Sequence, residues 1–185
     1  MKIANRSFIL PIALAVFCCL APLGAQTTDK LPQPILISSA GQSADVAIAG
    51  MLCKKLNLQA KAEALAKNSN LEGVKTLMMV AGFSSKGLGA AGVSREQEQA
   101  RIQALLSAAR EKGIRIITLH LGGKARRGAQ SDEFNKLAAE SSERLIVVRQ
   151  GDEDRFFSNI AAEKKIPIDL VDRISDVMQP LGKLF

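Results

Sequence analysis

The sequence contains no tryptophan and no tyrosine, so its seven phenylalanines are its only large aromatic residues. Sites for single-stranded nucleic acids stack the bases on aromatic side chains, and sugar-binding sites commonly use aromatic platforms too. The scarcity of such side chains argues against both ligand classes. We therefore predict no nucleic-acid partner.

The sequence is also poor in metal ligands. His120 is the only histidine, and Cys53 is the only cysteine after residue 25. One residue of each kind is too few for a typical transition-metal site, and a lone cysteine cannot form an internal disulfide. The acidic run 152–154 lacks the spacing of a calcium loop, so we interpret it as acids at the start of a helix. We predict no metal site.

The first 25 residues have the pattern of a cleavable signal peptide. Lys2 and Arg6 precede an apolar run of 14 residues, 8–21, which is too short to span a membrane. We place cleavage near Ala25 and predict export to the periplasm or outside the cell. An uncleaved membrane anchor is the alternative. After cleavage we predict no membrane span.

The rest of the chain divides into a short tether, 26–33, and one domain, 34–185. Cleavage removes two of the 25 Lys and Arg residues and none of the 18 acids, which leaves a net charge of +5. A mildly basic domain suits anionic ligands or envelope surfaces.

Within the domain, continuous apolar runs alternate with amphipathic segments. The runs that begin at 34, 75, 114 and 144 are typical of strands buried on both faces, and 58–64 alternates like an edge strand. Helices are predicted to begin after Ser94, with Gln97 completing a capping box, and at four other positions. These positions are Asp45, Ser131, Asp152 and Asp169.

This alternation predicts a Rossmann-like α/β fold. We expect a three-layer sandwich with a mainly parallel sheet of about five strands in the flavodoxin-like order 2-1-3-4-5. Ligands of such sheets bind outside the carboxyl ends of the strands, where the strand order reverses. Here that place lies between the first and third strands. It would be formed by the loops 38–45, 82–94 and 122–131.

These loops hold the unusual composition of the chain. Their glycines let the backbone approach a ligand closely, and the helices that follow direct the positive ends of their dipoles toward the same edge. Lysines and arginines add full charges, and serines and a glutamine add hydrogen bonds. The predicted ligand-binding residues are Ser38, Ser39, Gln42, Ser43, Ser84, Ser85, Lys86, Gly87, Lys124, Arg126 and Arg127.

The motifs of specific cofactor-binding sites are incomplete or absent in this sequence. The run 87–92 matches the glycine pattern of dinucleotide-binding loops, but no acid follows the next strand to bind a ribose. No phosphate-binding loop with Gly-Lys-Ser or Gly-Lys-Thr is present. We therefore predict no cofactor.

A catalytic alternative rests on Ser84 and His120. The run 82–86 differs by one residue from a nucleophile elbow, with Lys86 in place of glycine. Ser84 would be the nucleophile of a hydrolase, His120 its base, and Asp45 or Asp152 the acid. The simpler interpretation is that Ser84 hydrogen-bonds the loop or a ligand and that His120 packs at the end of its strand.

Three runs resemble a known family in combination. They are 39–45 (Ser-Ala-Gly-Gln-Ser-Ala-Asp), 84–92 (Ser-Ser-Lys-Gly-Leu-Gly-Ala-Ala-Gly), and 122–128 (Gly-Gly-Lys-Ala-Arg-Arg-Gly) with Ser131-Asp132. Together they resemble an uncharacterised family of exported bacterial α/β domains over about residues 33–184. The resemblance implies export and a single small domain, but no activity.

The leading hypothesis from the sequence is an exported binding protein for a small anionic molecule. Lys86 and Arg126 or Arg127 would supply positive charge. A serine hydrolase that uses Ser84 and His120 is one alternative. The other is a non-catalytic domain that contacts an envelope protein.

Overall fold

A computed structural model describes residues 30–185. The predicted signal peptide and residues 26–29 of the predicted tether lie outside the described residues. Leu31 is buried against the domain, and its N–H donates a hydrogen bond to the carbonyl of Leu184 at 2.6 Å. The Thr76 hydroxyl donates to the carbonyl of Pro32 at 2.6 Å. The start of the described chain is thereby held beside its carboxyl end.

The sheet has six parallel strands in the order β2-β1-β3-β4-β5-β6. The predicted order of the first five strands is confirmed, and β6 extends the sheet beyond β5. Every residue of β1 and β3 is buried, as expected for strands covered on both faces. The strands are β1 Ile35–Ala40, β2 Ala60–Ala62, β3 Thr76–Ala81, β4 Arg115–His120, β5 Arg144–Val148 and β6 Ile168–Val171.

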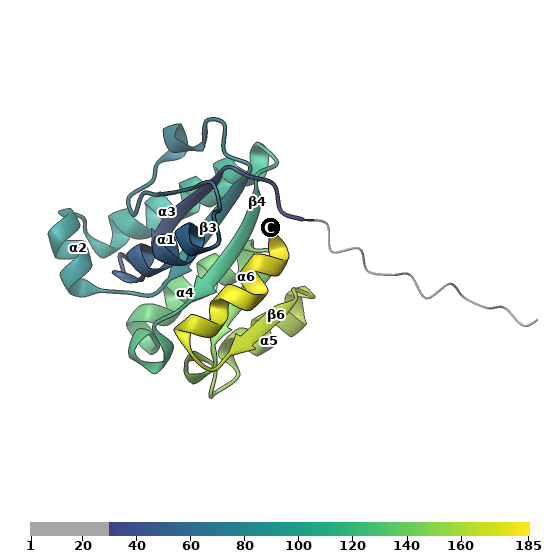
Figure 1. Cartoon of the computed structure of the whole chain (residues 1–185). Helices are drawn as coiled ribbons and strands as arrows, with labels where there is room; N and C mark the ends of the chain where they lie inside the picture. Colours follow the sequence, from purple (N-terminus) through teal and green to yellow (C-terminus); the bar gives the residue numbers. More distant parts are fainter. Residues whose placement is uncertain (1–29) are drawn as a thin grey trace, which may run out of the picture.

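Helices cover both faces of this sheet, which gives the predicted three layers (Figure 1). Helices α1 and α6 pack on one face, and α3, α4 and α5 pack on the other. Each fully buried Leu, Ile or Phe contributes about 1.5–3 kcal/mol through burial. The helices are α1 Asp45–Lys55, α2 Ser85–Ala91, α3 Arg95–Glu111, α4 Ala129–Ser141, α5 Phe156–Lys164 and α6 Met178–Leu184.

Two helix signals in the sequence are confirmed by their geometry. Ser94 Oγ accepts the N–H of Gln97 at 3.2 Å, and Gln97 Oε1 accepts the N–H of Ser94 at 2.8 Å, which forms the predicted capping box of α3. Gly113 follows the last turn of α3 with φ +66°, a conformation that favours glycine.

The segment 82–94 is more ordered than the glycine-rich loop that the sequence predicts. Ser85–Ala91 forms the short helix α2, because Ser84 Oγ accepts the N–H of Gly87 at 3.0 Å and caps its first turn. Gly92 ends α2 in the left-handed conformation, with φ +66°. The loop between β3 and α3 therefore contributes a helical wall to the edge of the sheet.

Two helix starts predicted from the sequence are wrong. Helix α4 begins at Ala129, after Gly128 with φ +104°, so Ser131 lies inside its first turn. Helix α5 begins at Phe156 and not at Asp152. Asp152 instead caps it from four residues earlier, because its Oδ1 accepts the N–H of Phe157 at 2.7 Å.

The predicted helix from Asp169 is also wrong at its start. Residues Ile168–Val171 form β6 and pair with β5, and Asp169 forms an ion pair with Arg144 at 2.8 Å. The helix α6 begins only at Met178, after a short 3₁₀ helix, Ile174–Val177. Leu170, Ile174 and Leu181 fit a helical spacing, and a four-residue strand is too short to reveal its own period.

Candidate functional site

The predicted loops meet at one edge of the sheet, beyond the carboxyl ends of β1, β3 and β4. The loops after β1 and β3 are joined directly, because the Ser84 N–H donates to the carbonyl of Gly41 at 2.8 Å. Gln42 and Phe83 form an isolated bridge between the same loops. Neighbouring strands β1 and β3 mark the reversal of strand order, where α/β sheets commonly bind ligands.

Two adjoining cavities open at this edge, and we refer to them together as the crevice. The first cavity has a volume of about 630 Å³ and is lined by residues 83–86 and 125–131. The second cavity has a volume of about 680 Å³. Ser84, Lys86 and Arg126 line both. The remaining lining of the second cavity is Gln42, Ser43, Ala44, Val46, Ala47, Ala62, Ala64, Gly87 and Ala90.

Arg126 stands between the two cavities with its side chain 29% exposed. Its Nη1 donates to the carbonyl of Phe83 at 3.2 Å, and its Nε lies 3.8 Å from Asp45 Oδ2. That carboxylate oxygen is buried, and no described residue donates a hydrogen bond to it. A side chain at Gly122 would place its Cβ 2.0 Å from Cγ of Arg126, so glycine is required for Arg126 to lie there.

Lys86 is the second cation of the crevice. It is exposed near the start of α2, and within residues 30–185 no ion pair is formed by its ammonium group. The position of α2 depends on Gly87, because a Cβ there would lie 1.9 Å from the carbonyl oxygen of Gln42. Ser85, beside Lys86, is exposed in the first cavity.

The start of α4 forms one wall of the first cavity. Gly128 is its N-cap and provides no side-chain cap to the free N–H groups of the first turn. Gly128, Ala129 and Gln130 are exposed and line the cavity. The positive end of the α4 dipole therefore faces the same hollow as Lys86 and Arg126, an arrangement that favours an anion.

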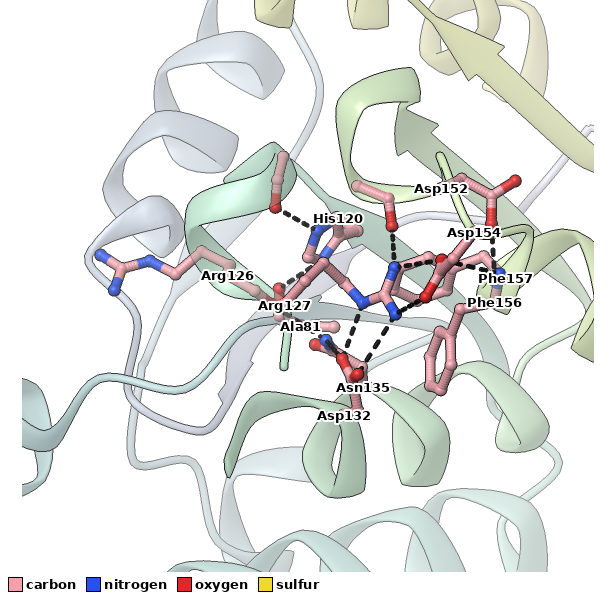
Figure 2. A network of polar contacts seen from close by, with 12 residues as sticks. Ala81, His120, Arg126, Arg127, Asp132, Asn135, Asp152, Asp154, Phe156 and Phe157 are labelled. Carbon is pink, nitrogen blue, oxygen red and sulfur yellow. Dashed lines mark hydrogen bonds and ion pairs between the residues drawn. The ribbon is translucent and has the colours of Figure 1, made fainter. Parts of the chain in front are cut away.

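Arg127 occupies a different environment from Arg126, as Figure 2 shows. Its Nε lies 2.7 Å from Asp132, and its Nη2 lies 2.8 Å from Asp154. Nη1 donates to the carbonyl of Gly151, and the guanidinium lies 4.3 Å from the ring centre of Phe156. These contacts raise the pKa of Arg127, and the largest cause is the hydrogen bonds that its guanidinium donates to Asp154. Arg127 therefore links its own loop to α4 and to the segment before α5, and all its donors are used in contacts that hold the fold together.

Lys124, the third predicted cation of this loop, is exposed and points to another partner. Its ammonium nitrogen lies 3.6 Å from Glu153, and it lines neither cavity. Of the four cations that the sequence proposed for the site, the structure brings Lys86 and Arg126 together. It pairs Lys124 with Glu153 and Arg127 with Asp154, both in the segment before α5, although Arg127 also lines the first cavity.

The polar residues of the first loop are mainly structural. Ser38 Oγ donates to the carbonyl of Ala64 at 3.2 Å, and Ser43 Oγ accepts the N–H of Asp45 at 3.0 Å. Ser39 is fully buried, and its hydroxyl is without a partner among the described residues. Ser43 also lines the second cavity.

A buried ion pair that the sequence analysis missed holds this loop in place. Glu98 is fully buried in α3 and accepts hydrogen bonds from the Gly41 N–H and from Gln42 Nε2, each at 3.0 Å. Arg101 lies 2.7 Å from Glu98 and donates to the carbonyl of Ser39 at 2.6 Å. Glu98 stands four residues before the buried Ile102, so it lies on the face of the helix that packs on the core. This spacing could have indicated from the sequence that Glu98 is buried.

His120 and Ser84 have separate partners. The ring nitrogens of His120 lie 3.1 Å from the carbonyl oxygens of Ala81 and Gly123. Burial lowers the pKa of His120, while the two carbonyls act in the opposite direction. Ser84 Oγ accepts from Gly87, and no hydrogen bond between Ser84 and His120 occurs in residues 30–185.

The two acids proposed for a catalytic triad are also engaged. Asp45 faces Arg126, and Asp152 accepts hydrogen bonds from the Phe157 and Ser158 N–H groups at the start of α5. In the part of the chain that the structure describes, neither acid hydrogen-bonds His120. Within residues 30–185 these side chains are therefore not assembled as a nucleophile, base and acid.

Other chemistry is limited in the described residues. Cys53 is buried, and burial raises the pKa of its thiol to about 11, so it is a core residue and not a reactive thiolate. No group of three or more His, Cys, Asp and Glu residues within 30–185 is placed to hold a metal ion. No helix in this range has the length and apolar character to cross a membrane.

Comparison with known proteins identifies the family of the chain. Neither the curated proteins nor the solved structures contain a match to it. One family model matches residues 32–185, which includes the whole sheet, all six helices and every residue of the crevice. The chain therefore belongs to the family described as Domain of unknown function (DUF6305).

Proposed function

We propose that the protein is an exported binding protein that holds a small anionic ligand in the crevice at the carboxyl edge of the sheet. Its place of action would be the periplasm or the outside of the cell. The observation that supports this proposal is that Lys86 and Arg126 line both cavities. Arg126 has a single acidic neighbour, Asp45 at 3.8 Å, and Lys86 has no ion pair among residues 30–185.

The physical argument is electrostatic. Arg127 also lines the first cavity, but its charge is matched by Asp132 and Asp154. The charges of Lys86 and Arg126 face only the Asp45 carboxylate among residues 30–185, and the uncapped start of α4 adds a partial positive charge. An anion that enters would receive hydrogen bonds from a guanidinium, an ammonium and backbone N–H groups, each of which is stronger when one partner is charged. Ser84 and Ser85 are close enough to the cavities to add hydroxyl groups.

The test is thermal unfolding of the purified protein with a panel of small carboxylates, inorganic phosphate, phosphate esters and nucleotides. A ligand present at 100 times its dissociation constant stabilises a protein by about 2.7 kcal/mol. For a domain of this size, that corresponds to roughly 5–10 °C in Tm. We expect one class of anion to raise Tm and a neutral analogue of the same size to leave it unchanged.

A double variant, Lys86→Ala with Arg126→Ala, locates the site. It should abolish the shift while the protein remains folded. The matched control is Arg110→Ala with Lys112→Ala, which removes the same charge from the end of α3, at the opposite edge of the sheet. Equal loss of binding in both double variants would show that only net charge matters and would overturn the proposed site. No shift with any anion would overturn the proposed function in favour of an envelope protein partner.

A further inference from the structure

The two cavities of the crevice differ in chemistry. The first is lined by charged and polar groups together with the start of α4. The second combines the shared Ser84, Lys86 and Arg126 with a wall of apolar side chains. This wall comes from α1, α2 and the edge strand β2 with its following residues. Its members are Ala44, Val46, Ala47, Ala62, Ala64 and Ala90.

Most of the apolar wall is exposed, because no other part of the described chain covers it. Ala44, Ala47, Ala62 and Ala90 are all exposed side chains around one hollow. These small side chains leave the cavity its volume of about 680 Å³, which lies in the range of small-molecule sites. A hollow that is apolar on one side and positively charged on the other complements a molecule with both properties.

We propose that the ligand is a free aliphatic anion, whose charged group binds at Lys86 and Arg126 and whose hydrocarbon body lies in the second cavity. This inference rests on the proposed function and adds the class of ligand to it. No aromatic side chain lines the second cavity, so the body is bound by contact with methyl groups rather than by ring stacking.

The geometry also limits the length of the hydrocarbon. A further hollow of about 510 Å³ shares Ala62 with the second cavity, and Lys54 and Asn57 line it together with Gly50, Leu58 and Ala60. A chain that extended past Ala62 would bring methylene groups against polar side chains without hydrogen-bonding them. The second cavity therefore suits a short chain.

The experiment measures the affinity of the purified protein for propionate, butyrate and hexanoate by calorimetric titration. Burial of each added methylene should raise the affinity roughly threefold, so hexanoate should bind about thirtyfold more tightly than propionate. Gluconate has the same charge and the same number of carbons as hexanoate, but it carries hydroxyl groups. It should bind no better than propionate.

Ala47→Leu fills the second cavity from α1 and keeps a good helix former at an exposed position. It should lower the affinity for hexanoate at least tenfold and leave the affinity for propionate unchanged. Ala90→Leu, on the opposite wall, is the second variant and should act in the same direction. Ala162→Leu on α5, which is exposed and lines neither cavity, is the matched control and should change neither affinity.

The outcomes separate this inference from the proposed function. Equal affinity for all three acids, with binding still lost in the Lys86/Arg126 double variant, would overturn the aliphatic ligand and leave anion binding intact. A chain-length effect that persists in both Ala47→Leu and Ala90→Leu would place the hydrocarbon elsewhere and overturn the inference as well. If neither these acids nor any anion of the thermal-unfolding panel binds, the proposed function itself fails.

Discussion

Arg126 and Arg127 are neighbours in the sequence, but they belong to two regions with opposite properties. Arg127 is enclosed by Asp132, Asp154 and Phe156, and its charge is matched by two carboxylates. Arg126 extends away from this cluster, as Figure 2 shows, and lines both cavities of the crevice. Arg126 is the last residue of a short 3₁₀ helix, Gly123–Arg126, and Arg127 follows it with an extended backbone. The two side chains therefore point in different directions, so adjacent charges can serve different purposes.

The comparison teaches how a charged loop is divided between stability and binding. A guanidinium surrounded by carboxylates, a carbonyl and a ring has no donor left for a ligand, whereas its loss would leave those groups unpaired. A guanidinium with one distant carboxylate retains donors and contributes less to folding. We expect the two arginines to separate stability from ligand binding.

The largest expected effect is that of Arg127→Ala on stability. The substitution removes two ion pairs and a hydrogen bond to the carbonyl of Gly151, and it leaves Asp132 with only the Asn135 amide as a side-chain partner among the described residues. We expect the free energy of unfolding, measured by urea denaturation, to fall by about 3 kcal/mol.

Arg127→Lys serves as the control for this prediction, because lysine keeps the charge but not the planar fork that contacts two carboxylates. It should lose part of the stability that Arg127→Ala loses. A decrease below about 1 kcal/mol for Arg127→Ala would mean that the cluster contributes no more than surface ion pairs do, and the contrast with Arg126 would disappear.

Arg126→Ala should have a smaller effect on stability, a decrease of about 1 kcal/mol by the same measurement. The cost arises because Asp45 Oδ2, which is buried without a hydrogen bond, loses the nearby positive charge. Asp45→Asn in the Arg126→Ala background should recover most of this loss. A loss as large as that of Arg127→Ala would show that Arg126 is also committed to the fold.

The smallest expected effect is that of Asp154→Asn, and it depends on pH. The side chain of Asp154 is 64% exposed, so at pH 7 its ion pair contributes less than about 1 kcal/mol. The hydrogen bonds from Arg127 lower the pKa of Asp154 from 3.8 to about 2. A carboxyl whose pKa is lower in the folded state stabilises the fold above its unfolded pKa, and this is lost as pH falls through the folded value.

The difference in unfolding free energy between the native chain and Asp154→Asn should therefore be constant above about pH 4 and shrink toward pH 2. Urea denaturation at a series of pH values measures it. Glu153→Gln is the control, since Glu153 is an exposed acid whose only ion pair among the described residues is with the exposed Lys124 at 3.6 Å. A difference for Asp154→Asn that does not change between pH 4 and pH 2 would contradict the role of Arg127 in lowering this pKa.

Local patterns in the sequence determined most of the fold. The apolar runs of β1, β3, β4 and β5 show their burial directly, because strands covered on both faces have no polar face to alternate. The capping box at Ser94 and Gln97 located the start of α3 because both partners lie within one turn. The order of the strands and the edge that carries the crevice then follow from general rules of α/β topology.

The short elements could not be obtained in this way. Helix α2 has seven residues, two of which are glycines, and β6 has four residues, so neither displays a clear period. The start of α5 depends on Asp152 accepting N–H groups five and six residues later, which is outside the usual capping distance.

The division of the charged residues was decided only by the tertiary structure. The sequence placed Lys86, Lys124, Arg126 and Arg127 in one group, because all four follow strands at the same edge. Their partners can come from distant positions: Asp154, which pairs with Arg127, stands 27 residues after it. Local periodicity reports which face of an element is buried, but ion pairing depends on side chains that only the folded chain brings within contact distance.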